Sequence, residues 1–207
     1  MMTGFQSNLM LYIVIGCLIV CIGINIIVKV IRNRKLHQMV LLLNAKKFKE
    51  FDRLLESKLV KLIFDPFNID YIRLNGYLYK QNKKEIDKAF SSFDHVRLTA
   101  KQKDDIDLKA FNYYLSENDI PKIEKYYHNI IHSESNKMKK EVKRLYDIYV
   151  NKGSKYLDEL MAETNTLRGK YKASNELLIS AIYANLGNKN KEKEYRNLAE
   201  THLNDNV

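Results

Sequence analysis

The chain contains two kinds of hydrophobic pattern, one continuous and one periodic. Residues 9–28 read LMLYIVIGCLIVCIGINIIV, which is a run of twenty residues without a charged side chain. A helix of this length is about 30 Å long and matches the hydrocarbon core of a bilayer. Lipid offers no water to backbone polar groups, so a segment that crosses it must be helical. The run therefore predicts a transmembrane helix over residues 9–31, after a short non-cytoplasmic N-terminus of residues 1–8.

Three other interpretations of this apolar run are weaker. A cleaved signal peptide carries a charged segment before its apolar region, but residues 1–8 contain no Lys or Arg. The lipoprotein-like stretch Val14–Cys17 lacks the same segment, and apolar residues follow it where a polar tether is expected. A buried helix of a globular core is rarely apolar over such a length. We therefore expect a retained membrane anchor that contacts the lipid bilayer through residues 9–31.

The charges that flank the run predict its orientation. Four cations follow it closely, namely Lys29, Arg32, Arg34 and Lys35. Positively charged flanks remain in the cytoplasm. We therefore expect a single-pass protein of the cell membrane, with its N-terminus outside and residues 32–207 in the cytoplasm. The same four cations can also contact anionic lipid headgroups.

Beyond the run, hydrophobic residues recur with the period of an α-helix. The clearest stripe occupies positions i, i+3, i+4, i+7 and i+8, and consists of Ile123, Tyr126, Tyr127, Ile130 and Ile131. Such a stripe is one apolar face of a helix, and no segment shows a sustained period of two. The sequence therefore predicts an all-α domain. Its first helix, Lys35–Leu43, should continue from the membrane helix, because no Gly or Pro lies between Val28 and Asn44.

Several boundaries of the predicted helices carry chemical signals. Asp65–Pro66 combines an N-cap with a proline at the first helical position. Thr99 and Gln102 match a capping box, and Gly187–Asn188 favours a left-handed helix stop. Ser154 follows a polar turn and can cap the next helix. These signals predict where helices begin and end.

The predicted turns recur at a nearly constant interval. They lie 33–38 residues apart, near Asn44, Asn82, Asn118, Asn151 and Asn188. Residues 77–88 (YLYKQNKKEIDK) align with residues 114–125 (YLSENDIPKIEK) at an offset of 37. A period of this size indicates stacked helical hairpins. Each hairpin buries its apolar face against the next, so the stack is expected to form one continuous domain over residues 32–207.

This pattern resembles the tetratricopeptide repeat family over residues 36–204. The resemblance is clearest in the second hairpin, where the family's Gly, Tyr, Ala and aromatic positions are matched by Gly76, Tyr79, Ala89 and Phe93. It implies a right-handed solenoid of four to five hairpins with a concave face that binds segments of other proteins. Residues expected near that groove are Arg73, Tyr77, Lys80 and Tyr114. The alternatives are an irregular helical bundle for the fold and burial between helices for the two tyrosines.

The net charge of +10 adds a second candidate function. Basic proteins bind nucleic acids, anionic membranes or acidic protein partners. One predicted helix carries a basic face formed by Lys137, Lys139, Lys140, Lys143 and Arg144. This basic face is either simply solvated or a contact surface, with nucleic acid the less expected ligand. We therefore expect a membrane-anchored scaffold for an unknown protein or peptide. The alternative is a protein that binds nucleic acid or an anionic membrane surface.

No motif in the sequence indicates catalysis. His128 and His132 have the spacing of two metal ligands on a helix, but no glutamate lies between them and no third ligand is apparent. The acidic cluster at 104–107 falls at a predicted helix start, where carboxylates favour the positive end of the helix dipole. Both cysteines lie inside the apolar run. We therefore expect no enzymatic activity, no metal site and no cofactor.

Overall fold

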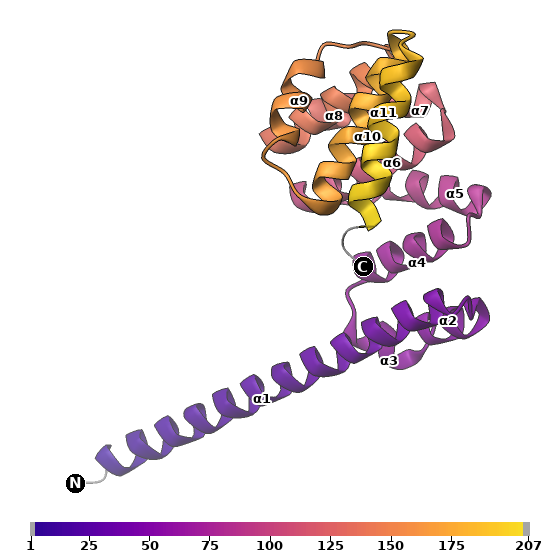
Figure 1. Cartoon of the computed structure of the whole chain (residues 1–207). Coiled ribbons are helices and arrows are strands. Elements are labelled where there is room, and N and C mark those ends of the chain that lie inside the picture. Colours follow the sequence, from indigo (N-terminus) through magenta and orange to yellow (C-terminus); the bar gives the residue numbers. More distant parts are fainter. Residues whose placement is uncertain (1–2, 205–207) are drawn as a thin grey trace. The chain divides into compact units, whose positions relative to one another are not determined.

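The structure is a computed structural model that describes the backbone of residues 3–204 and the side chains of residues 14, 15 and 17–204 (Figure 1). Within these residues it is all-α, with eleven helices and no strand, as the hydrophobic period predicts. The helices are α1 Thr3–Asn44, α2 Phe48–Leu55, α3 Lys58–Ile63, α4 Pro66–Tyr79, α5 Lys83–Phe93, α6 Ala100–Glu117, α7 Ile120–Ile131, α8 Asn136–Tyr149, α9 Leu157–Thr164, α10 Gly169–Asn185 and α11 Lys189–Asn204.

The chain divides into two compact units, Met1–His95 and Val96–Val207. The first unit contains α1 to α5, and the second contains α6 to α11. The division falls inside the single domain expected over residues 32–207. A solenoid that continues through both units therefore stays a prediction.

Helix α1 runs without a break from Thr3 to Asn44 (Figure 1), which confirms that Lys35–Leu43 continues the apolar run. Its large apolar side chains between Val14 and Ile27 are exposed, with 43–64% of their surface open. Among the residues whose side chains are described, no helix is both long and apolar enough to cross a membrane. The side chains of residues 1–13 and 16, which include part of the expected membrane segment, lie outside the described residues.

The core of the first unit joins the C-terminal part of α1 to α2, α3 and α4. One cluster of buried side chains contains Met39, Leu43, Phe51, Leu55, Val60, Phe64 and Ile69. Helices α4 and α5 pack as a hairpin, with the rings of Phe67 and Phe93 edge to face at 5.8 Å. Gly76 allows α4 to approach α2 closely, because a Cβ atom at this position would lie 2.6 Å from Cε1 of Phe51. This close approach gives a physical reason for the glycine in the second hairpin.

The second unit contains the α6–α7 and α10–α11 hairpins, with α8 and α9 packed on α10. The stripe predicted on α7 is largely buried, and Tyr126 stacks on Tyr114 of α6 at 5.7 Å. Another buried cluster consists of Ile148, Leu160, Ile179 and Ile182. Asn185 joins α10 to the end of α8 and to the loop that follows it. Its Nδ2 donates to the carbonyl oxygens of Ile148 at 2.8 Å and of Gly153 at 3.2 Å.

Four hairpins close with the same backbone turn. In each turn one residue takes a left-handed conformation, and these residues are Lys46, Gln81, Asn118 and Gly187. The N–H of the next residue donates to a carbonyl five positions earlier, which is the Schellman motif. That next residue is the N-cap of the following helix, and Asn82, Asp119 and Asn188 each accept a backbone N–H through their side chains. The predicted stop at Gly187 is therefore confirmed.

Two further predicted boundaries are confirmed and one is wrong. Oδ1 of Asp65 accepts the N–H of Phe67 at 2.9 Å, and Thr99 forms a reciprocal capping box with Gln102. Ser154 does not cap a helix, because α9 begins at Leu157 with Tyr156 as its N-cap. Between α8 and α9 the chain first folds against the end of α8, where the N–H of Gly153 donates a hydrogen bond to the carbonyl oxygen of Asp147 at 2.8 Å. The serine is therefore placed ahead of the helix start.

We expect Gln81→Gly to raise the free energy of unfolding by about 0.5–1 kcal/mol. A side chain in the left-handed region costs about 1–2 kcal/mol, part of which the greater chain entropy of unfolded glycine offsets. Asn118→Gly is the matched control and should change little, because asparagine tolerates this conformation. Urea unfolding of the detergent-solubilised protein measures both variants. Equal gains from the two substitutions would contradict this explanation.

Candidate functional site

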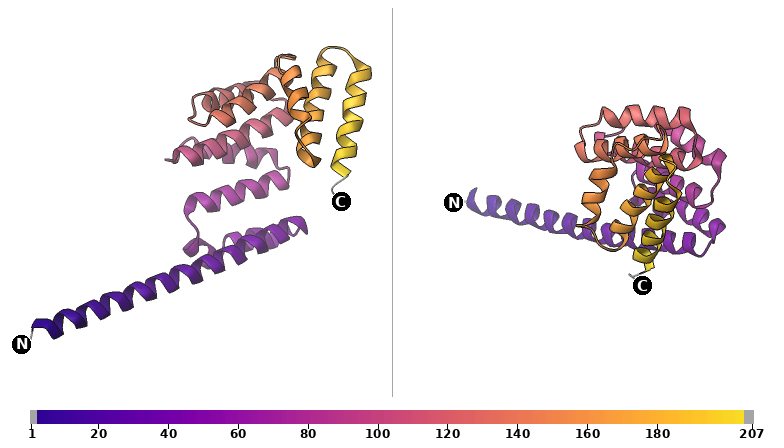
Figure 2. Two further views of the ribbon diagram at one scale, coloured as in Figure 1. Left: turned by 60° about the vertical axis from the view of Figure 1, so that its left-hand side comes forward. Right: turned by 45° about the horizontal axis from the view of Figure 1, so that its top comes forward.

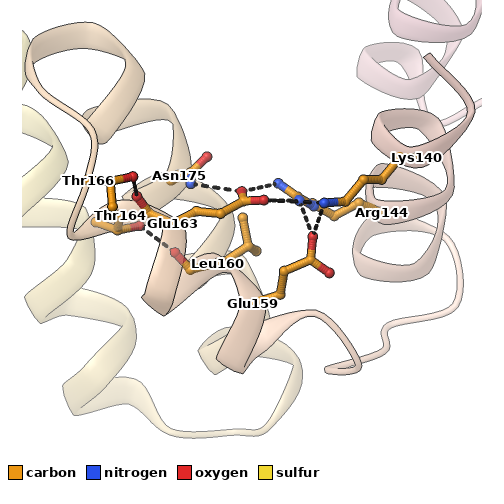
Figure 3. A network of polar contacts seen from close by, with 8 residues as sticks. All are labelled: Lys140, Arg144, Glu159, Leu160, Glu163, Thr164, Thr166 and Asn175. Carbon is orange, nitrogen blue, oxygen red and sulfur yellow. Dashed lines mark hydrogen bonds and ion pairs between the residues drawn. The ribbon is translucent and has the colours of Figure 1, made fainter. Parts of the chain in front are cut away.

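The best-connected polar site lies in the second unit, where α8, α9 and α10 meet (Figure 3). We name it the ion-pair cluster, and it consists of Lys140, Arg144, Glu159, Glu163 and Asn175. Nη2 of Arg144 donates to Oε1 of Glu159 at 2.6 Å and to Oε1 of Glu163 at 3.0 Å, while Nη1 donates to Oε2 of Glu163 at 2.9 Å. Only 12% of the Arg144 side chain is exposed. The Arg144 guanidinium is therefore held in place between α8 and α9.

The cluster has two facing rows. Lys140 and Arg144 are one turn apart on α8, and Glu159 and Glu163 are one turn apart on α9. Nζ of Lys140 lies 2.7 Å from Oε1 of Glu159, and Nδ2 of Asn175 donates to Glu163 at 3.5 Å. Matching rows of cations and carboxylates at a spacing of four residues were a signal in the sequence, although they did not reveal which helices pack together.

The ion-pair cluster reduces the free positive charge of the basic face. Two of its five members, Lys140 and Arg144, form ion pairs with carboxylates of α9. Lys137 and Lys143 are exposed, and Lys139 is half-buried. Part of the positive charge expected on this surface is therefore neutralised inside the unit. Whether the basic face binds nucleic acid or headgroups stays a prediction.

Hydrogen bonding to cations lowers the pKa of both glutamates. The Lys140 ammonium is the main cause at Glu159, with Arg144 adding to it and partial burial opposing it. The Arg144 guanidinium is the main cause at Glu163, again opposed by partial burial. Both carboxylates are therefore charged at neutral pH. The cluster is a clamp between helices and does not present a group with a pKa suited to proton transfer near neutral pH.

An open groove runs beside the cluster between α8 and α10. Its volume is about 530 Å³, within the range of sites that bind ligands or short segments. Apolar side chains that line it are Leu145, Leu167, Tyr171 and Leu178, and polar ones are Lys137, Lys140, Glu141, Arg144, Glu163, Ser174 and Asn175. Tyr171 has 65% of its surface exposed. This α8–α10 groove therefore offers apolar contact surface next to fixed charges.

Two of the residues expected in a binding groove line a smaller cleft in the first unit. Arg73 and Tyr77 lie in a cleft of about 330 Å³ between α4 and α5. Arg73 is also paired with Asp70 and, at 2.8 Å, with Glu56. Because Asp70 and Glu85 line this cleft together with Arg73 and Lys88, its charges balance.

The other two residues expected in the groove take different positions. Lys80 pairs with Asp52 at 2.8 Å and lies over the ring of Phe48 at 5.5 Å from its centroid. Tyr114 belongs to the second unit and has 2% of its surface exposed, in stacked contact with Tyr126. Tyr114 is therefore buried between helices, which was the alternative to a place in the groove.

His132 and part of the acidic cluster lie where α6, α7 and α8 meet. Asp107 has 5% of its surface exposed and accepts hydrogen bonds from Lys103 at 2.7 Å and from Asn129 at 3.0 Å. His132 lines an open cleft of about 910 Å³ with Asp104, whose Oδ2 accepts the Ser133 hydroxyl at 2.9 Å. Among the described residues, no group of three or more His, Cys, Asp or Glu side chains has the arrangement to hold a metal ion.

We expect acid to weaken the ion-pair cluster. Because the folded-state pKa values of Glu159 and Glu163 are lowered from about 4.5, the folded state binds fewer protons than the unfolded state. Their stabilising contribution is present above that pH and is lost as the pH falls through the folded-state values. Both side chains are partly exposed, so we expect a total of about 1 kcal/mol or less.

The test compares the parent with the double variant Glu159→Gln/Glu163→Gln. Urea unfolding at about pH 7 and about pH 3.5 gives the loss of stability on acidification. This loss should be smaller in the double variant, because the two titrating carboxylates are absent. Glu56→Gln is a parallel test in the first unit, because Lys61 and Arg73 lower the pKa of Glu56, and this variant should also lose less stability on acidification than the parent. An unchanged loss in the double variant would contradict the expectation.

No family model, no curated protein and no solved structure matches this chain. A functional assignment therefore depends on the chemistry of the residues themselves. The α8–α10 groove and the exposed apolar surface of α1 are the described features from which a function can be proposed.

Proposed function

We propose that this protein is a membrane-anchored helical scaffold that binds a segment of another protein at the cytoplasmic face of the cell membrane. The observation that carries the binding half is the α8–α10 groove. Its apolar floor would lose contact with water when a peptide side chain enters, and burial of apolar surface is the main source of affinity in such grooves. Arg144 and Glu163 also line the groove and are already paired with each other, so this part of its wall is ordered before a partner binds.

The chemistry of the groove defines the partner segment. Leu145 and Leu178 suit aliphatic side chains, and the exposed ring of Tyr171 suits either an aliphatic or an aromatic contact. Lys137 is exposed at the same groove and favours a carboxylate in the partner. We therefore propose a peptide segment that combines apolar side chains with an acidic one.

The membrane half of the proposal is supported by the sequence and by the exposure of α1. The run of twenty uncharged residues at 9–28 is long enough for the hydrocarbon core. The described apolar side chains of α1 from Val14 to Ile27 have no cover from the rest of their unit. Such a surface is unfavourable in water. Lys29 and the three further cations up to Lys35 favour a cytoplasmic location for the part that follows.

The recurring turns support a solenoid related to tetratricopeptide repeats. The left-handed residues of the five turns, Lys46, Gln81, Asn118, Lys152 and Gly187, are 34–37 residues apart. Gly76 also permits a close helix contact at the position where the family has a glycine. We propose on this basis that the hairpins form one right-handed stack.

Site-directed substitution combined with crosslinking tests the groove. The tagged full-length protein is crosslinked in membranes and isolated, and the same is done for Tyr171→Asp and Leu177→Asp. Both substitutions place a charge on an exposed apolar position of α10, but only Tyr171 lines the groove. A crosslinked partner should be retained by Leu177→Asp and lost from Tyr171→Asp. A partner retained by both variants, or lost from both while they stay folded, would overturn the groove assignment.

Extraction tests the anchor separately. Membranes that contain the full-length protein are washed with alkaline carbonate, which removes peripheral proteins, and then treated with detergent. The protein should remain in the membrane pellet until detergent is added, because burial of about twenty apolar residues makes dissociation into water unfavourable. Its release by carbonate alone would overturn the anchor.

A further inference from the structure

We propose that α3 is a second membrane contact of this protein, at which Leu59 and Leu62 insert into the interfacial layer of an anionic bilayer beside the anchor. This inference rests on the proposed anchor and adds a lipid-binding surface to it. The two leucines are separated by three positions and therefore lie on one face of α3. Leu62 has 82% of its surface exposed, more than any other large hydrophobic side chain that is described, and Leu59 has 43%.

A neighbouring face of α3, which carries Val60 and Ile63, fixes the helix to α1. Val60 is fully buried in the cluster that contains Met39, and Ile63 packs against the same cluster. The Ser57 hydroxyl caps the helix by accepting the N–H of Val60. The exposed position of Leu62 is therefore a consequence of how α3 is held, and the side chain is presented outward on a fixed support.

The hairpin brings α3 toward the proposed membrane end of α1. The turn at residues 45–47 is short, so α2 runs back along α1 and α3 follows on that side, as Figure 1 shows with its labels and Figure 2 from two further directions. Met39 is about 16 Å of helix axis beyond Val28, the last residue of the apolar run. The headgroup layer of a bilayer occupies about 5–7 Å of that distance. A tilt of α1 by about 40° toward the side of α3 covers the rest, because it shortens the axial rise to about 13 Å and lowers a helix packed about 9 Å from the α1 axis by about 6 Å. Leu62 can therefore reach the interface while α1 remains in the membrane.

Charge in this part of the chain favours anionic lipid. Residues 29–61 contain ten Lys and Arg residues and three acidic ones, whereas residues 62–207 contain 25 and 22. Most of the excess positive charge is thus next to the proposed anchor. Lys58 and Lys61 flank the leucines on α3, and Lys61 remains 53% exposed although it pairs with Glu56. Leucines between lysines on an interfacial helix are the combination that binds anionic membrane surfaces.

The absence of tryptophan from the chain permits a direct test. Single tryptophans are introduced into the full-length protein as Leu62→Trp, Tyr79→Trp or Val20→Trp, and each variant is reconstituted into vesicles that contain anionic lipid. Brominated lipids then quench a tryptophan that lies in the bilayer. Tyr79 is the matched control in the same unit, because its hydroxyl contacts Asn44 at the far end of α1. Val20 reports on the anchor, and thermal unfolding checks that each variant is folded.

We expect strong quenching for Val20→Trp and clear quenching with a blue-shifted emission for Leu62→Trp. Tyr79→Trp should show little quenching. When zwitterionic lipid replaces the anionic lipid, the quenching of Leu62→Trp should decrease while that of Val20→Trp persists. This pattern would support the α3 contact.

Other results separate the two proposals. An unquenched Val20→Trp variant would overturn the anchor, and the α3 contact with it. Quenching of Val20→Trp without quenching of Leu62→Trp would overturn only the α3 contact. A blue-shifted but unquenched Leu62→Trp variant would mean that protein covers α3, which also overturns a lipid contact. Undiminished quenching of Leu62→Trp in zwitterionic vesicles would overturn the assignment to an anionic surface.

Discussion

Replacement of His202 by alanine should lower the free energy of unfolding by about 2–3 kcal/mol. His202 of α11 lies with its Nδ1 2.8 Å from Oε2 of Glu176 on α10, and the Glu176 side chain has only 2% of its surface exposed. Removing the imidazole leaves the buried Glu176 side chain without this hydrogen bond, and an unsatisfied buried group of this kind costs about 3 kcal/mol or more. We expect a somewhat smaller loss because 22% of the His202 side chain is exposed, so water can reach the vacated space.

A second substitution distinguishes the hydrogen bond between His202 and Glu176 from the packing of the imidazole ring. In a Glu176→Gln background the partner is a neutral amide, which costs less to leave unpaired than a carboxylate. His202→Ala should therefore cost clearly less in that background than in the parent. Urea unfolding of the four proteins gives the coupling energy. Equal costs in both backgrounds would assign the effect to ring packing alone.

Gly76→Ala should lower the free energy of unfolding by about 1–2 kcal/mol, although alanine is the better helix former. The added Cβ atom would lie 2.6 Å from Cε1 and 3.0 Å from Cζ of Phe51. This ring has 1% of its surface exposed and packs in the cluster that contains Leu55 and Val60, so it has little room to move. Overpacking of this kind costs about 1–3 kcal/mol, against a gain of about 1 kcal/mol in helix propensity.

The matched test removes the ring that causes the clash. Leucine lacks the two carbon atoms of Phe51 that would meet the new methyl group. In a Phe51→Leu background, Gly76→Ala should therefore be neutral or stabilising, because the helix propensity of alanine then dominates. Thermal or urea unfolding of the four proteins checks this reversal of sign. Destabilisation by the same amount in both backgrounds would contradict the proposed contact.

Much of the local structure was predictable from short stretches of sequence. The caps at Asp65 and Thr99 and the stop at Gly187 depend on residues only a few positions apart, and all three are confirmed. The left-handed turns at Lys46 and Gln81 were predictable in place but not in conformation. Neither residue type favours this backbone region, so the closure of the hairpin imposes it.

The candidate site was only half visible in the sequence. The cations of the basic face were identified, but Glu159 and Glu163 were not recognised as their partners. Their spacing matches that of Lys140 and Arg144, yet many pairs of helices in a basic chain offer such a match. The sequence also did not determine that Tyr114 is buried and Leu62 exposed. Both belong to apolar stripes, and such a stripe does not specify which of its side chains a neighbouring helix covers.

The sequence by itself determined the all-α class, the period of the turns and the continuous first helix, because these depend on propensities and hydrogen bonds within a few residues along the chain. Only the tertiary structure decided which face of α8 meets α9, why Gly76 has no side chain and where α3 presents Leu62. These features depend on side-chain packing between segments far apart in sequence, and the hydrophobic pattern of one segment does not select its neighbour.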